Sequence, residues 1–181
     1  SLGLNLDYYK DDYENMVLGL TEASGFTVTP SLTHTFNDKV STTAYFTYDR
    51  LKSDQSGREW IVTPAVSNAW AASDDNTTQT VGLSLNWKAV VKKLDLSADL
   101  VYSDFSGKIR YPGSSNLPEL TSRLTVIGIN GVYQLKDNLA LRAGYRYENY
   151  RESDWANTDL ATVATLGVTP EKQETHVVFL S

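Results

Sequence analysis

A two-residue alternation between apolar and polar side chains recurs along the chain and limits the fold more than any other feature. Between Val81 and Ala89, every second residue is Val, Leu, Trp or Ala, and the residues between them are Gly, Ser, Asn and Lys. Successive side chains of a β-strand point to opposite faces of a sheet, so this period predicts a strand with one apolar face. Comparable runs cover residues 2–9, 26–36, 40–49, 81–89, 94–103, 121–135, 139–148 and 175–181. The chain is therefore predicted to be an all-β protein.

The sixth of these runs does not keep a single period. Leu124 and Val126 fall on the face opposite to Ile127 and Ile129, so the apolar side changes within the run. An extra residue in one strand shifts the side chains that follow it by one position. We therefore expect a β-bulge near Gly128.

The connections between the runs are alternately short and long. The short ones cover residues 37–39, 90–93 and 136–138, and the long ones cover residues 10–24, 50–78, 104–120 and 150–174. Outer-membrane barrels have short periplasmic turns and long extracellular loops, and their strands of about ten residues cross the hydrocarbon layer at a tilt. The pattern favours an antiparallel, up-and-down transmembrane β-barrel of about eight strands. It forms one domain over residues 1–181, with both termini on the periplasmic side.

A water-soluble sandwich or lipocalin-like barrel is the alternative, because its strands alternate in the same way and the class is commoner. Such a barrel packs its apolar rows inward and exposes Lys and Glu on its other face. Here the other face carries small and polar residues, such as Gly82, Ser84, Asn86 and Gly144, which suit a water-filled lumen. Aromatic residues expected at the two membrane interfaces are Tyr8, Tyr9, Phe36, Tyr48, Trp87, Tyr102, Tyr133, Tyr147 and Tyr150. The two faces together favour the membrane barrel.

Composition excludes several functions. The chain has 16 Lys and Arg against 22 Asp and Glu, a net charge of −6, which argues against nucleic-acid binding. Cysteine is absent, so thiolate metal sites and covalent c-type haem are excluded within this segment, and any haem must belong to a partner. No catalytic, cofactor or metal motif occurs, and we expect no enzymatic activity. The acidic groups Asp11/Asp12/Glu14 and Asp74/Asp75 are expected to solvate extracellular loops.

A second group of charges lies within the predicted strands, on their polar side. Asp95 and Asp99 belong to the fifth run, and Arg142, Arg146 and Glu148 belong to the seventh. Side chains on this face project into the lumen, where opposite charges can pair with one another or contact a partner. Ordinary lumen lining and a partner-binding surface are therefore both open for these five residues.

Several short motifs resemble the MtrB/PioB family of decahaem-associated outer-membrane barrels. They occur in the order of that family's C-terminal part and span nearly the whole chain. The motifs are Tyr13 with Gly19-Leu20-Thr21, Trp70 with Asp74/Asp75, Leu117-Pro118-Glu119-Leu120, Tyr147-Glu148-Asn149-Tyr150, Asp154-Trp155-Ala156, and His176 to Ser181.

The resemblance implies a barrel in the outer membrane of a Gram-negative bacterium, in contact with outer-membrane lipid. Members of this family sheathe a periplasmic multihaem cytochrome and let it pass electrons across the membrane, often to a second cytochrome outside. They are several times longer than this chain and carry N-terminal strands and a short cysteine motif that it lacks. Either the chain is a C-terminal segment of such a barrel, or it is a shortened relative that closes with eight strands. The second alternative would be a small passive porin or structural barrel, because an eight-stranded barrel is filled by its own side chains.

Overall fold

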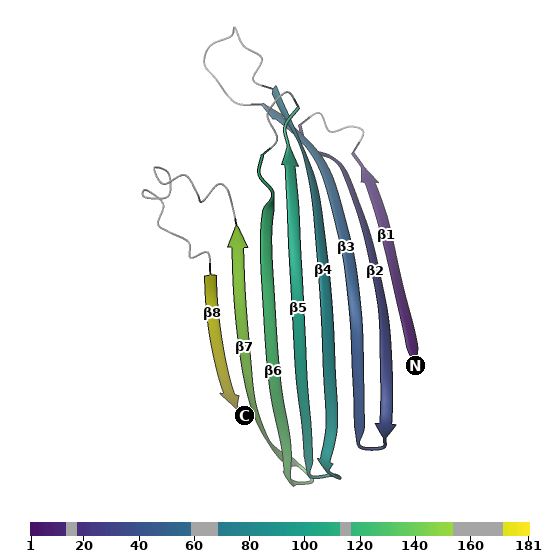
Figure 1. Ribbon diagram of the computed structural model, residues 1–181, viewed down its shortest axis with the longest axis vertical. Helices are drawn as coiled ribbons and strands as arrows, with labels where there is room; N and C mark the ends of the chain where they lie inside the picture. The colour runs from purple at the N-terminus through teal and green to yellow at the C-terminus, as the bar shows by residue number, and fades with distance from the viewer. Residues whose placement is uncertain (14–17, 59–68, 113–116, 154–171) are drawn as a thin grey trace.

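The computed structural model describes residues 1–13, 18–58, 69–112, 117–153 and 172–181. These residues form one antiparallel sheet in which the order of the strands in space follows their order in the chain (Figure 1). The strands are β1 (Leu2–Asp12), β2 (Gly19–Asn37), β3 (Val40–Arg58), β4 (Ala69–Val90), β5 (Leu94–Arg110), β6 (Leu120–Lys136), β7 (Leu139–Ser153) and β8 (Lys172–Leu180). The predicted all-β, antiparallel, up-and-down arrangement is thereby confirmed. In the described part of the chain, no helix has the length and apolar character needed to span a membrane.

The sheet is open in this structure. Strand β1 pairs only with β2 and β8 pairs only with β7, so each leaves one edge without a neighbour among the described residues (Figure 1). Backbone groups at a free edge need hydrogen-bond partners, and a hydrocarbon environment supplies none. The closed eight-stranded barrel is thus not observed for these residues.

Several strands are longer than the sequence pattern indicates. Strand β4 has 22 residues and β3 has 19, whereas about 9–11 residues cross the hydrocarbon layer. The extra length comes from polar stretches that were expected to form loops: Asp11 and Asp12 lie in β1, and Asp74 and Asp75 lie in β4. The loop assignment of these four carboxylates was wrong. In β4, Asp74 faces the hydroxyl of Ser53 and Asp75 faces Lys52 and Lys108, which favours pairing there. Glu14 lies outside the described residues.

All three short connections lie at the same end of the sheet, as predicted (Figure 1). At the first, the Asn37 side-chain oxygen accepts hydrogen bonds from the backbone N–H groups of Lys39 and Val40, at 2.8 and 3.0 Å. At the second, Lys92 has a positive φ of 59°, which tightens the turn. Both ends of the described chain also lie near this end, because Leu2 pairs with Leu32 and Leu180 pairs with Ala143.

The sixth strand has no bulge near Gly128. Gly128 pairs in continuous register with Asp99 on one side and with Arg146 on the other, so the expected bulge was wrong. Leu124 and Val126 therefore keep their places on the polar side of the sheet. The register shift in the β6–β7 pair lies instead between Gln134 and Lys136, beside the turn.

The register places most of the apolar residues of the eight strands on one side of the sheet, here called the apolar face. One cross-strand row joins Leu83, Leu100, Ile127 and Tyr147. The apolar face includes Leu4, Leu6, Val28, Ala44, Phe46, Leu83, Leu85, Ala98, Leu100, Ile127, Ile129, Tyr145 and Val178. Every second residue before and after these along each strand lies on the same side.

No second protein layer covers the apolar face in the described part of the chain. Leu85 is 42% exposed, Ile129 is 53% exposed, and Ala72 is the one described hydrophobic residue that is fully buried. A water-soluble sheet of this size would bury such a face in a core. An exposed apolar face on every strand is what a lipid-facing barrel wall requires.

Aromatic residues border the apolar face at both ends of its strands. Tyr48, Tyr102 and Tyr147 lie toward the long-loop end, and Trp87 and Tyr133 lie toward the short turns. Two expected members of this border are on the opposite side of the sheet. Tyr9 pairs with Gly25 and Tyr150 pairs with Leu124, which places both rings on the polar side.

Charge placed on the apolar face tests the lipid-facing assignment. We expect Leu85→Arg to lower the free energy of unfolding by about 2–4 kcal/mol, because a cation near the middle of the hydrocarbon layer loses its hydration. Ser84→Arg is the matched control, since the adjacent side chain points to the polar side, and its effect should be mild. Denaturant unfolding in lipid vesicles measures both. Equal effects of the two substitutions would contradict the assignment.

Candidate functional site

The side of the sheet opposite the apolar face, here called the polar face, is the candidate functional surface. Hydroxyl groups on neighbouring strands are linked across it. Thr29 and Thr47 lie 3.0 Å apart between their Oγ1 atoms, Thr33 and Thr43 lie 2.9 Å apart, and the Thr27 hydroxyl donates to Asp49 at 2.6 Å. Thr80 and Ser103 continue the pattern on β4 and β5 at 3.0 Å. These short side chains make a hydrophilic surface without bulky projections.

Aromatic rings on the polar face lie over glycines of the neighbouring strand. The ring of Tyr45 covers Gly82, its partner in the register, so closely that a Cβ on Gly82 would lie 2.1 Å from ring carbons. The same arrangement pairs Tyr9 with Gly25, Trp70 with Gly57 and Phe179 with Gly144. A glycine opposite an aromatic residue lets the ring lie along the sheet. Large side chains therefore stay against the polar face.

The five charges singled out from the sequence all lie on the polar face. Asp99 and Arg146 flank Gly128 from opposite sides in one cross-strand row, and Asp95 and Arg142 flank Val132 in another. Strand β6 thus separates the acidic residues of β5 from the basic residues of β7. Glu148 lies two positions beyond Arg146 on β7.

Only one ion pair joins members of this group within the described residues. The Arg146 Nε and Glu148 Oε1 atoms lie 2.5 Å apart, with side chains 56% and 33% exposed. Asp95, Asp99 and Arg142 form no ion pair within 4 Å in the described part of the chain. Their charges are open to solvent or to another molecule on the polar face.

Asp95 has a neighbour that sequence reasoning missed. Lys88 on β4 is its direct partner in the register, and both residues line a shallow hollow of about 280 Å³ together with Ser97, Asn130 and Val132. The alternation placed Lys88 on the polar side, but only the pairing of β4 with β5 brings the two charges opposite each other.

The polar face carries more acidic than basic residues. Its described anions are Asp7, Asp11, Asp49, Asp74, Asp95, Asp99, Glu148 and Glu152, and its described cations are Lys88, Arg142 and Arg146. Most of the anions belong to β1, β3, β4 and β5, whereas two of the cations belong to β7. The face thus has an acidic region and a mixed region.

Charged residues also continue the apolar face beyond its aromatic border, toward the long-loop end. Arg50 and Asp75 form a two-bond ion pair there, with nitrogen–oxygen distances of 2.9 and 2.7 Å. The hydrogen bond from Arg50 lowers the pKa of Asp75 below its ordinary value. Lys10 pairs with Glu22 at 3.1 Å in the same region. These pairs join neighbouring strands in stretches that the sequence pattern assigned to loops.

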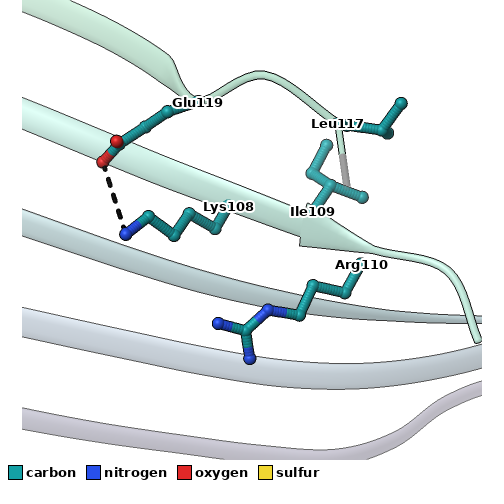
Figure 2. A pocket seen from close by; sticks show the side chains of 5 residues that line it. All are labelled: Lys108, Ile109, Arg110, Leu117 and Glu119. Atoms are coloured by element: carbon teal, nitrogen blue, oxygen red, sulfur yellow. Dashed lines mark ion pairs between the residues drawn. The ribbon is translucent and has the colours of Figure 1, made fainter. Parts of the chain in front are cut away.

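A hollow of about 350 Å³ lies near the long-loop end of β5 (Figure 2). Lys108 forms an ion pair with Glu119 at 3.9 Å, and the Arg110 side chain extends beside it on the same side of the ribbon (Figure 2). Ile109 and Leu117 complete the lining.

The histidines have structural contacts. The ring of His34 packs edge-on against Phe36 with centroids 4.5 Å apart, and His176 shares a hydrogen bond of 2.8 Å with the Tyr145 hydroxyl. In the described ranges, no three His, Asp or Glu side chains gather closely enough to hold a metal ion.

An antiparallel sheet with an exposed apolar face, a hydrophilic opposite face and strands longer than the hydrocarbon layer defines the wall of an outer-membrane β-barrel. A family model described as "Putative outer membrane beta-barrel porin, MtrB/PioB" matches residues 1–181. The chain belongs to this family, which confirms the resemblance seen in the motifs and the outer-membrane location.

A curated relative, "Outer membrane protein MtrB" of Shewanella baltica (strain OS185), is similar to this chain. The two are 26% identical over 153 residues, which cover 83% of this chain and 21% of the relative. The chain thus spans about a fifth of the relative's length. Of the motifs that carried the resemblance, Tyr147–Tyr150 lies in β7 and Leu117–Leu120 leads into β6, whereas Asp154–Ala156 lies outside the described residues.

The contact between Tyr45 and Gly82 can be measured as a coupling energy. We expect Gly82→Ala to cost about 1 kcal/mol in the free energy of unfolding, because the new methyl group forces the Tyr45 ring off the sheet. In a Tyr45→Ala background the same change should cost almost nothing, and the double-mutant cycle isolates the contact. Gly128→Ala is the matched control, since a Cβ there meets no atom closer than 3.9 Å. A cycle with no coupling would show that the ring does not rest on the glycine.

Proposed function

We propose that the chain forms part of the wall of an outer-membrane barrel that sheathes a multihaem c-type cytochrome and supports electron transfer across the outer membrane. The observation that carries the proposal is the open sheet: eight strands lie side by side, and neither β1 nor β8 pairs with a further strand among the described residues. Such a sheet suits a segment of a wider wall, and the length of the MtrB relative supports the same view.

The width of the barrel decides what its lumen can hold. Eight strands closed on themselves leave an interior that side chains fill, whereas many more strands enclose a wide lumen. The hydroxyl rows and the rings lying over glycines keep large side chains against the polar face, which leaves space for a bulky occupant. In this proposal the short turns and both ends of the described chain face the periplasm, and the long connections face outward.

Electron transfer in this proposal belongs to the partner. The chain has no cysteine, so it offers no attachment for c-type haem. Its own role is to exclude lipid from the cytochrome, position it across the membrane and leave its outer end accessible to an extracellular cytochrome. No enzymatic step is assigned to the barrel.

The charges on the polar face are the proposed contact with the cytochrome. Asp95, Asp99 and Arg142 form no ion pairs within the described residues, and Arg146 and Glu148 form an exposed pair with each other. Charged groups without an ion-pair partner can orient a bound protein and make its binding specific. Their attraction weakens with added salt.

A passive porin is the second candidate function. The family description itself names a porin, and the hydrophilic polar face would also line an aqueous channel. The two functions differ in whether the lumen holds a protein.

Purification of the native protein separates these functions. Under mild detergent extraction, we expect haem-staining material to remain with the barrel, because a sheathed cytochrome is held on several sides. The measurement is a haem stain and an intact mass of the isolated complex. A haem-free barrel that conducts ions in planar bilayers would favour the porin function instead.

Charge reversal on the polar face tests the contact itself. We expect Arg142→Glu with Arg146→Glu to reduce cytochrome retention and to make what remains more sensitive to salt, while heat-modifiable gel migration shows that the barrel still assembles. Lys108→Glu with Arg110→Glu is the matched control, because it reverses two cations on the opposite side of the sheet. If the polar-face variant keeps the cytochrome across a salt series as well as the unmodified protein does, these residues are ordinary lumen lining.

A further inference from the structure

Three cations stand side by side on the apolar face beyond its aromatic border. Arg123 on β6 pairs in the register with Arg151 on β7, which pairs in turn with Lys172 on β8. All three side chains point to the same side as Ile127 and Tyr147. Arg123 is four residues from Ile127 along β6, and Arg151 is four residues from Tyr147 along β7. Lys172 shares their side because it is the register partner of Arg151. This cation row places like charges directly opposite one another on adjacent strands, about 5 Å apart between backbones.

Like charges in directly opposed positions destabilise a sheet, so the cation row needs compensation. Asp104 lies 2.9 Å from Arg123, and Glu174 lies 2.6 Å from Lys172. Arg151 is exposed and has no ion pair within 4 Å among the described residues. The side chains of Arg123 and Lys172 are 67% and 50% exposed, so they remain accessible to a further anion. The row thus keeps a surplus of positive charge.

Other ion pairs on this side of the sheet differ from the cation row. Lys10 is matched by Glu22, and the Arg50 guanidinium is matched by Asp75 through two hydrogen bonds. In those places each cation has its own anion on the neighbouring strand. The cation row differs from these places because its three cations are direct partners in the register on adjacent strands.

The position of the cation row relative to the apolar face indicates the kind of ligand. Arg151 lies four residues beyond Tyr147, a distance of about 13 Å along the strand and less along the membrane normal because barrel strands are tilted. Below the row, Tyr147 and His176 pack with ring centroids 5.0 Å apart, and the exposed Val178 continues the apolar face. A ligand bound here would have its anionic part against the cations and its apolar part against this surface.

We propose that Arg123, Arg151 and Lys172 form a binding site for the phosphate groups of a phosphorylated lipid in the membrane leaflet nearest the long connections. Guanidinium groups bind phosphate through paired hydrogen bonds, and an ammonium group adds a compact charge. The acyl chains of the lipid lie along Tyr145, Tyr147 and Val178. The site depends on the outward orientation of the apolar face and not on the presence of a cytochrome.

The test uses the full-length protein reconstituted in vesicles of phosphatidylcholine with or without lipid A, a phosphorylated glycolipid. After extraction, native mass spectrometry counts the lipid A molecules that stay bound. We expect Arg123→Gln with Arg151→Gln to weaken lipid A retention at least about tenfold, because two charge-assisted contacts are removed. Lys88→Gln is the matched control, since it removes a cation from the polar face, and it should leave retention unchanged.

Two further variants keep the test decisive if the double substitution fails to assemble. Arg151→Lys preserves the charge and should keep most of the lipid, and Glu174→Gln removes the competing anion of Lys172 and should strengthen retention. Retention that is unchanged in the double variant, or unaffected by Glu174→Gln, would overturn the proposal. Displacement of lipid A by inorganic phosphate at equal concentration would also overturn it, because the acyl contacts would then contribute nothing.

Discussion

The apolar face is the constraint on which the rest of the structure depends. In the described part of the chain no second layer of protein covers it, and every strand exposes at least one large hydrophobic side chain on this face. Burial of such a surface is worth roughly 25 cal/mol per Å² of apolar area, so it must be covered by something other than water. Lipid serves this purpose, and it then requires every backbone group in contact with it to be hydrogen-bonded. The long antiparallel pairing of β2 to β7 satisfies that requirement, and β1 and β8 satisfy it on one side each among the described residues.

The two sides of the sheet perform different tasks. On the polar face, the rows of hydroxyl groups and the aromatic rings lying over glycines leave few side chains that project far from the sheet. Strand β6 separates the charges of β5 from those of β7. On the opposite side, charges are confined to the ends of the strands beyond Tyr48, Tyr102 and Tyr147. In the proposed function, protein and lipid partners bind opposite sides of the sheet, which the same two-residue period separates. A substitution on one side should leave binding on the other side intact.

Ion pairs join neighbouring strands beyond the aromatic border. Isolated surface ion pairs contribute little stability, but Arg50 with Asp75 and Lys10 with Glu22 join neighbouring strands at positions already fixed by backbone pairing. They favour continued pairing where the apolar alternation has ended. The sheet beyond the aromatic border is therefore a polar extension, available to headgroups and to molecules outside the membrane.

The sequence by itself determined the presence of the strands, their antiparallel order, the end at which the turns lie and the shared face of Asp95, Asp99, Arg142, Arg146 and Glu148, because a period of two depends only on local backbone geometry. It also indicated the family through its motifs. Only the tertiary structure decided the register, and with it the continuous pairing at Gly128, the opposition of Lys88 to Asp95 and the pairing of Tyr9 with Gly25. The cation row of Arg123, Arg151 and Lys172 was equally hidden, since its members are far apart in the chain. Register depends on contacts between strands, so a pattern read along one strand cannot contain it.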